Sequence, residues 1–183
     1  MRNGKGRHAW VVRANPHHTT RIIEFLKRQF IAEAGTTRNM LSRVPDDKYD
    51  YKPHDKSMVM KNLVTHLADL PGWFHFTLTT DELDFQKAYE MPGITNNKEL
   101  LSYFDKRYND GLSVLVAENE TVLSNPWTLR NGETIYATNP KVDVLRMAIS
   151  QQIHHRAQLG VYLRLLNVPI PGSYGPSADE SDF

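Results

Sequence analysis

The sequence predicts an all-α bundle of four helices with one short β-hairpin between the third and the fourth helix. Four long stretches carry apolar residues every three or four positions, which is the period of an amphipathic helix. One further stretch, residues 121–138, has β-branched and aromatic residues around the turn signal Asn131-Gly132. The 183 residues suffice for one core of good size, so we expect residues 1–183 to form a single domain.

The first helix is expected to begin near residues 17–20, with Thr19 or Thr20 as its cap, and to end near Ser42. Residues 1–15 have no clear period and are expected to form a loose lead-in. Gly35 interrupts the helix and suggests that another helix approaches closely there. The apolar positions are Ile22, Ile23, Phe25, Leu26, Phe30, Ile31, Ala34, Met40 and Leu41.

The second helix follows a connection rich in proline and charge, and Ser57 can cap it. Pro71 lies inside the run and should kink the helix or end its first half, because proline lacks a donor and crowds the preceding turn. His66 shares a face with apolar residues, where a lone histidine is more often a satisfied core residue than a ligand. The apolar positions are Met58, Met60, Leu63, Val64, Leu67, Leu70, Trp73, Phe74 and Leu78.

The third helix is expected to begin after a loop that contains Pro92-Gly93, with Asn96 or Asn97 as its cap. Before that loop, the acidic residues Asp81, Glu82 and Asp84 indicate a solvated face. The apolar stripe of the helix is Leu100, Leu101, Phe104, Tyr108, Leu112, Leu115 and Val116.

The hairpin is expected to pair residues 127–130 with residues 134–137 through a type I′ turn, which Asn-Gly favours. A fourth helix then starts with Asn139 as cap and Pro140 in its first position, and Asn167 can stop it. Residues 168–183 are rich in Gly, Pro, Ser and acids and are expected to form a surface tail.

Composition argues against several classes of protein. The net charge of +1 gives no field that would attract nucleic acid or an anionic membrane, and no apolar run approaches the ~20 residues of a membrane span. The chain has no cysteine, which excludes thiolate metal ligands and a cysteine nucleophile and fits a reducing cytosol. The basic residues 1–13 lack the apolar segment of a secretory signal, so we expect a cytoplasmic protein. There is no Gly-rich phosphate loop and no Ser in a nucleophile elbow, so no catalytic residue is assigned.

Residues 149–160 hold the strongest functional signal, because two His, one Arg and three Gln stand where a core-facing helix is normally apolar. Gln151 and His155 are four apart, so they share one helix face and can reach one metal ion or one buried ligand. His66 can converge with them between neighbouring helices, giving three protein ligands and an open position. Such ligands suit zinc, nickel, iron or manganese. A solvated polar helix is the alternative, and His154, about 100° around the helix from His155, can face solvent, a dimer partner or the ligands themselves.

Short motifs follow one another along nearly the whole chain, from about residue 20 to residue 180. Together they resemble the DinB-like family of bacterial metal-binding helical bundles. The motifs are Glu33-Ala34 with Thr36-Thr37, Val44-Pro45-Asp46, Pro53-His54-Asp55-Lys56-Ser57-Met58, Leu63-Val64-Thr65-His66-Leu67-Ala68, His155-Arg156-Ala157-Gln158, and the ending Val168-Pro169-Ile170-Pro171-Gly172-Ser173-Tyr174-Gly175-Pro176-Ser177-Ala178-Asp179-Glu180.

The resemblance implies an up-down-down-up four-helix bundle that is often a homodimer. It also implies metal ligands from one His on the second helix and a His-x-x-x-His pair on the fourth. His66 and His155 match two of these ligands, whereas Gln151 stands where the family pattern has His. The result is a variant site with a Gln oxygen, a two-His site completed by water, or a site that no longer binds metal.

Characterised members of the family include thiol transferases that use mycothiol, bacillithiol or glutathione, together with isomerases and hydrolases. The resemblance therefore implies a metal-dependent thiol S-transferase or hydrolase that acts on a small molecule, with a low-molecular-weight thiol as a partner. The alternative is a non-catalytic bundle that binds a small molecule or dimerises and has a degenerate metal site. Fold and family do not fix the reaction.

Overall fold

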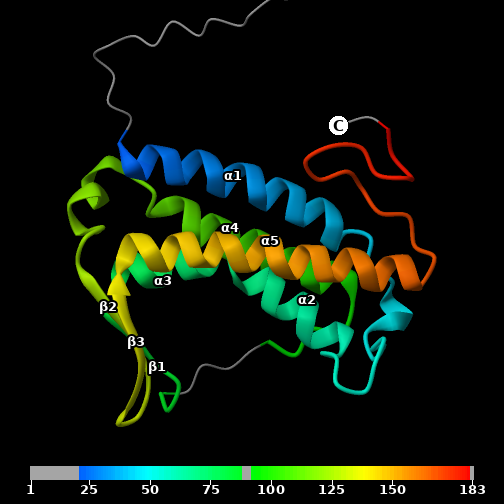
Figure 1. Ribbon diagram of the computed structural model, residues 1–183, viewed down its shortest axis with the longest axis horizontal. Helices are drawn as coiled ribbons and strands as arrows, with labels where there is room; N and C mark the ends of the chain where they lie inside the picture. Colours follow the sequence, from blue (N-terminus) through cyan, green and yellow to red (C-terminus); the bar gives the residue numbers. More distant parts are fainter. Residues whose placement is uncertain (1–20, 88–91, 182–183) are drawn as a thin grey trace, which may run out of the picture.

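The computed structural model describes residues 21–87 and 92–181, which form a mainly helical bundle with a small three-stranded mixed sheet at one end (Figure 1). The predicted lead-in 1–15 and the predicted caps Thr19 and Thr20 lie outside the described residues. The helices are α1 (Ile22–Leu41), α2 (Met60–Asp69), α3 (Gly72–Thr79), α4 (Asn97–Ser113) and α5 (Lys141–Leu165), with short 3-10 turns η1 (Asp46–Lys48) and η2 (Ala117–Val122). The strands are β1 (Glu82–Asp84), β2 (Pro126–Asn131) and β3 (Thr134–Pro140).

Helix α5 runs along the bundle and packs against both α1 and α2 (Figure 1). It is antiparallel to α2, because Tyr162 near the end of α5 donates to the Met58 carbonyl just before α2, while Gln151 contacts His66 further along. Helix α1 runs in the same direction as α5 (Figure 1). Buried apolar residues from α1, α2, α4 and α5 form the largest core cluster. Within the described residues, no helix is long and apolar enough to cross a membrane.

Pro71 divides the second predicted helix, as expected. Helix α2 ends at Asp69 and α3 begins at Gly72, with Pro71 between them in helical conformation at φ −59°. The two short helices continue along one side of the bundle, and both pack against α4. Gly35, in contrast, does not mark a close approach. It is exposed, and a Cβ there would meet nothing within 4 Å.

Helix α4 has the predicted local cap. The side chain of Asn96 accepts a hydrogen bond from the Glu99 N–H at 2.9 Å, and the Glu99 carboxylate accepts from the Thr95 N–H, also at 2.9 Å. This reciprocal arrangement resembles a capping box and satisfies donors at the helix start.

The predicted cap of α2 was wrong, because the helix begins three residues after Ser57 and has no side-chain cap. The N–H groups of Met60 and Lys61 instead donate to the carbonyls of Tyr51 and Tyr49, at 2.7 and 2.8 Å. The preceding connection therefore folds back and satisfies the helix start with its own backbone.

The start of α5 was also predicted wrongly. Strand β3 continues through Asn139 and Pro140, so the helix begins at Lys141 without a side-chain cap. The N–H of Lys141 donates to the Asn125 carbonyl at 2.9 Å, so a residue next to β2 supplies the acceptor. At the other end, Asn167 has a left-handed φ of 56° and ends the helix as predicted.

The hairpin is present, but its turn is not the predicted type I′. Asn131 still belongs to β2 and pairs with Thr134, so the two loop residues are Gly132 and Glu133. Gly132 has φ of 56°, whereas Asn131 is not among the described residues with positive φ, which a type I′ turn would require.

Of the three acidic residues, Asp81 is exposed as predicted. Glu82 to Asp84, however, form β1, a strand parallel to β2 that the sequence did not indicate, and Asp84 is buried. The Asp84 carboxylate accepts from the N–H groups of Gly132 and Gln86 at 2.9 and 3.0 Å, and these bonds lower its pKa. An acidic side chain thus fastens β1 to the hairpin turn, and the bundle is mainly helical rather than all-α.

Candidate functional site

The three predicted ligands lie together where α2 faces α5. His66 Nε2 is 3.3 Å from Gln151 Oε1, although the two residues are 85 positions apart. The ring of His155 meets the ring of His66 edge to face, with centroids 4.8 Å apart. All three side chains are half-buried, so the cluster lies at the rim of the helix interface rather than in the core.

The packing of α2 on α5 determines this position. On α2, His66 follows the buried residues Leu63, Val64 and Thr65 and precedes Leu67, so its backbone is fixed by the core. On α5, Gln152 is buried between the half-buried Gln151 and Ile153. A core residue on each helix therefore sets which way its polar neighbour points.

Gln158 orients the imidazole of His155. The Gln158 Oε1 atom lies 2.7 Å from His155 Nδ1. Because an amide oxygen only accepts hydrogen bonds, Nδ1 carries the proton and Nε2 keeps a free lone pair. A histidine that binds a metal ion through Nε2 needs this tautomer, with the proton on Nδ1.

The environment keeps His155 neutral. Burial lowers the pKa of His155, and the neighbouring rings of His66 and His154 lower it further, while the hydrogen bond that His155 donates to Gln158 opposes the shift. His154 is exposed and stacks edge to face on His155 with centroids 4.9 Å apart. A neutral imidazole at neutral pH is ready to bind a cation or to accept a proton.

The contact between His66 and Gln151 fits either a hydrogen bond or a shared metal ion. Two donors bound tetrahedrally to zinc at ~2.0–2.1 Å lie ~3.3 Å apart, which is the separation of His66 Nε2 and Gln151 Oε1. The cluster therefore fits a divalent cation in its spacing and donor types. Its donors are all neutral, so they compensate none of the charge of the cation, as a carboxylate would. The amide oxygen of Gln151 is also a weaker donor than a third imidazole, so this set holds the cation less tightly.

No three His, Cys, Asp or Glu side chains come together as a metal-binding group in residues 21–87 and 92–181. The cluster of His66, Gln151 and His155 is not such a group because its third member is an amide, although the two histidines are neighbours.

A cavity of about 310 Å³ opens beside His66. Thr65 is buried, and its hydroxyl has no hydrogen-bond partner among the described residues. Lys61 and Asn62 add further polar groups. The complete lining is Met58, Lys61, Asn62, Thr65, His66 and Pro92. A small polar molecule in this space would lie next to the imidazole of His66.

Arg156 has a structural role that sequence reasoning missed. It follows His155 directly but is buried and turned toward α1, where its Nη1 lies 2.7 Å from Glu33 Oε2. Nη1 also donates to Thr37, and Nη2 donates to the hydroxyl of Tyr174 at 2.8 Å. The only signal was that Glu33, Thr37, Arg156 and Tyr174 all lie in the motifs that carry the family resemblance.

The fold and this cluster define a helical bundle with an imidazole–amide site between two helices. The sequence model of the DinB family matches residues 17–182, so the chain belongs to the DinB family. A DinB-like protein of Bacillus subtilis, YjoA, has a similar structure, with a TM-score of 0.63 and 21% identity over 86% of this chain and 99% of that chain. A DinB-like protein of Bacillus cereus is similar with a TM-score of 0.64 and 21% identity, over 83% of this chain and 97% of that chain. The uncharacterised protein YrdA of Bacillus subtilis is 23% identical over 148 residues, which are 81% of this chain and 85% of YrdA. At these identities the solved structures establish the fold.

Proposed function

We propose that the protein is a metal-dependent enzyme that acts on a small molecule, as a thiol S-transferase or a hydrolase. A divalent cation, with zinc, nickel, iron and manganese as candidates, would be held by His66, Gln151 and His155. The observation that carries the proposal is the 3.3 Å separation of His66 Nε2 and Gln151 Oε1 beside the ring of His155. Membership of the DinB family supports it. The helix directions are compatible with the up-down-down-up order that the resemblance implies.

The residues of the chain have separate tasks in this proposal. Gln158 accepts a hydrogen bond from His155 Nδ1–H, which leaves the Nε2 lone pair of His155 to bind the cation. The cavity beside His66 receives the substrate, and Lys61, Asn62 and Thr65 orient its polar groups. When bound, a cation would lower the pKa of a thiol or a water molecule beside it.

Elemental analysis of untagged protein tests this proposal without an activity assay. We expect about one equivalent of metal in the wild-type protein and in a His75→Ala control, which removes an exposed histidine from α3. His66→Ala and His155→Ala should each lose most of it. Equal metal content in all four proteins would refute the proposed ligands.

The alternative is a non-catalytic bundle that binds a small molecule or dimerises, and the amide at position 151 favours it. In that case Gln151→His creates tight metal binding that the wild-type protein lacks. If the enzyme proposal holds, the wild-type protein already binds metal and Gln151→His only raises its affinity. One zinc titration of both proteins separates these outcomes.

The class of reaction can be tested with a simple electrophile, 1-chloro-2,4-dinitrobenzene. A thiol transferase would consume it only when a low-molecular-weight thiol is added, because the thiol is the second substrate. An ester substrate such as 4-nitrophenyl acetate, turned over without added thiol, would instead indicate a hydrolase. Whichever of the two activities the wild-type protein shows should be lost in His66→Ala.

We further propose a cytoplasmic homodimer with a small-molecule substrate and with no nucleic-acid or membrane partner. The balanced charge of +1 supports the last point, since nucleic-acid binding depends on many uncompensated cations. Light scattering during size-exclusion chromatography would test the dimer. A mass of 21.1 kDa at micromolar concentration would contradict it.

A further inference from the structure

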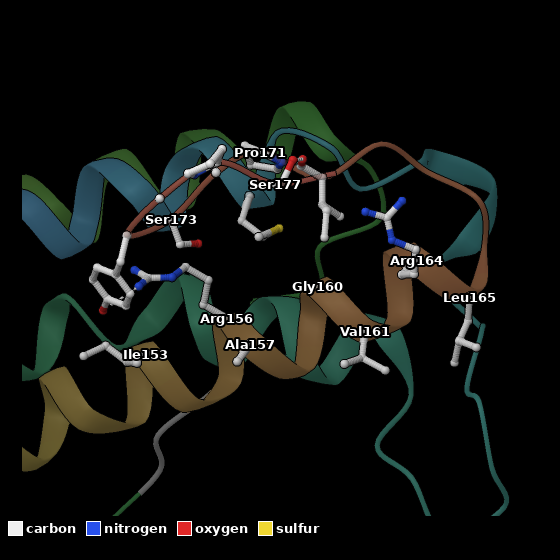
Figure 2. A pocket seen from close by; sticks show the side chains of 16 residues that line it. Ile153, Arg156, Ala157, Gly160, Val161, Arg164, Leu165, Pro171, Ser173 and Ser177 are labelled. Atoms are coloured by element: carbon white, nitrogen blue, oxygen red, sulfur yellow. Dashed lines mark hydrogen bonds between the residues drawn. The ribbon is translucent and has the colours of Figure 1, made fainter. Parts of the chain in front are cut away.

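The C-terminal segment, residues 168–181, folds back over α5 and leaves a groove of about 620 Å³ beneath it (Figure 2). We call this segment the strap. The groove lies along the face of α5 that carries Ile153, Ala157 and Val161 (Figure 2). It shares no lining residue with the cluster of His66, Gln151 and His155. Its volume is in the range of sites that bind small molecules.

The strap is fastened to the helices at several points. Asp179 pairs with Arg164 of α5 at 2.6 Å. Glu180 pairs with Arg43, just after α1, at 2.5 Å. Nearer the groove, the Tyr174 hydroxyl lies 2.8 Å from the buried carboxylate of Glu33. A ligand would therefore meet a largely ordered site.

The floor and walls of the groove are mainly apolar. Val161 and Leu165 of α5 lie at the open side of the groove and are each 58% exposed. Gly160 keeps the floor low, because a Cβ there would meet only Met40 Cε at 3.7 Å. The apolar side chains of the lining, together with Gly160 on the floor, are Met40, Ile153, Ala157, Val161, Leu165, Ile170, Pro171 and Pro176. An apolar molecule would shield these surfaces from water.

Arg156 gives the groove a polar end. It is only 2% exposed, yet it lines the groove. Nη1 donates hydrogen bonds to the Glu33 carbonyl, the Glu33 carboxylate and the Thr37 hydroxyl, and Nη2 donates to the Tyr174 hydroxyl. A guanidinium has five N–H donors. These bonds use Nη1 and one N–H of Nη2, so Nε–H and the other Nη2–H have no protein partner among the described residues.

The charged lining of the groove is entirely cationic. Arg156 and Arg164 line it, and each is paired with a carboxylate outside the lining, Glu33 and Asp179 respectively. No carboxylate belongs to the lining itself, so a head group in the groove meets guanidinium donors and no acidic side chain. An anionic head group is therefore favoured over a cationic one, and a carboxylate matches the planar guanidinium.

We propose that the groove under the strap binds a small carboxylic acid with an apolar body. The carboxylate lies at the unused donors of Arg156, and the apolar body lies along α5 toward Leu165. This site is independent of the proposed metal chemistry.

A pair of matched compounds tests the head group. Fluorescence of 8-anilinonaphthalene-1-sulfonate, itself an apolar anion, reports occupancy of the groove. We expect 4-phenylbutyrate to displace it at a concentration at least tenfold lower than 4-phenyl-1-butanol, which has the same body without the charge. Equal displacement by both compounds would overturn the assigned head group.

A pair of matched variants tests the location. Gly160→Leu fills the floor of the groove and should weaken 4-phenylbutyrate binding at least tenfold. Gly35→Leu makes the same change at an exposed position of α1 and should leave binding unaltered. Circular dichroism verifies that both variants fold. Val161→Glu, at an exposed position, is the second probe and should repel the acid without disturbing the core. Unchanged binding in Val161→Glu and in folded Gly160→Leu would place the acid elsewhere.

Discussion

Burial, rather than bond geometry, should decide how much each arginine–carboxylate pair stabilises this protein. Two pairs have the same shortest distance of 2.7 Å, Arg156 with Glu33 and Arg38 with Asp105. The first pair is almost fully buried, with side chains 3% and 8% exposed, whereas the second is 47% and 44% exposed. The exposed pair has the better geometry, since Arg38 contacts both oxygens of Asp105.

The expected costs differ several-fold. Glu33→Ala leaves the guanidinium of Arg156 buried without its counter-charge, which costs ~3–5 kcal/mol of unfolding free energy. It also removes the acceptor of the Tyr174 hydroxyl, so the strap loses one attachment. Asp105→Ala should cost ~0–1 kcal/mol, because water and salt already screen that pair.

Urea denaturation followed by circular dichroism measures both values, provided that the slope of the unfolding free energy against urea concentration is the same in the variants and the wild-type protein. Folded proteins are stable by only ~5–15 kcal/mol, so the Glu33→Ala effect is a large and easily resolved fraction. If Asp105→Ala cost as much as Glu33→Ala, or more, bond geometry rather than burial would decide the stability that such a pair contributes.

Two further predictions concern glycine packing and a buried hydroxyl. Gly111→Ala should cost ~1–3 kcal/mol by urea denaturation, because a Cβ would lie 2.4 Å from the Pro71 carbonyl oxygen and 2.8 Å from Phe30 Cζ. Gly35→Ala, in open space, should instead gain ~0.5–1 kcal/mol, and a loss of stability there would contradict the account. Burial, followed by the charges of two nearby carboxylates, raises the pKa of Tyr49 to about 12. Since the unfolded chain loses that proton near pH ~10, the wild-type protein should lose stability between about pH 10 and 12 relative to Tyr49→Phe, and identical pH profiles would be the contrary result.

Signals confined to a few neighbouring residues were predicted correctly. Pro71 divides α2 from α3, Asn96 caps α4, and Asn167 ends α5. Each of these effects comes from the backbone or side chain of the residue itself, so the sequence is sufficient to indicate it.

Helix starts that depend on distant groups could not be predicted. The Glu120 carboxylate accepts from the N–H groups of Ile22 and Ile23 at the start of α1, across almost a hundred residues. The carbonyls of Tyr49 and Asn125 likewise accept hydrogen bonds from the N–H groups at the starts of α2 and α5. No local pattern marks such partners, because they are chosen by tertiary packing.

The candidate site also combines a feature that local spacing predicted with one that depends on tertiary packing. The spacing of Gln151 and His155 predicted a shared face, while bringing His66 to them required the antiparallel packing of α2 on α5. The contact between Glu33 and Tyr174 spans 141 positions and depends on the strap folding back. A tail rich in Gly, Pro and Ser gives no indication of such a return.

The most direct test of the proposed metal site is anomalous diffraction at the zinc edge from crystals grown with zinc. The proposal predicts a peak within ~2.0–2.1 Å of a ring nitrogen of His66 and of His155, with Gln151 Oε1 as the third ligand. If no peak lies between α2 and α5 and Gln151 keeps its hydrogen bond to His66, the proposed metal chemistry is contradicted.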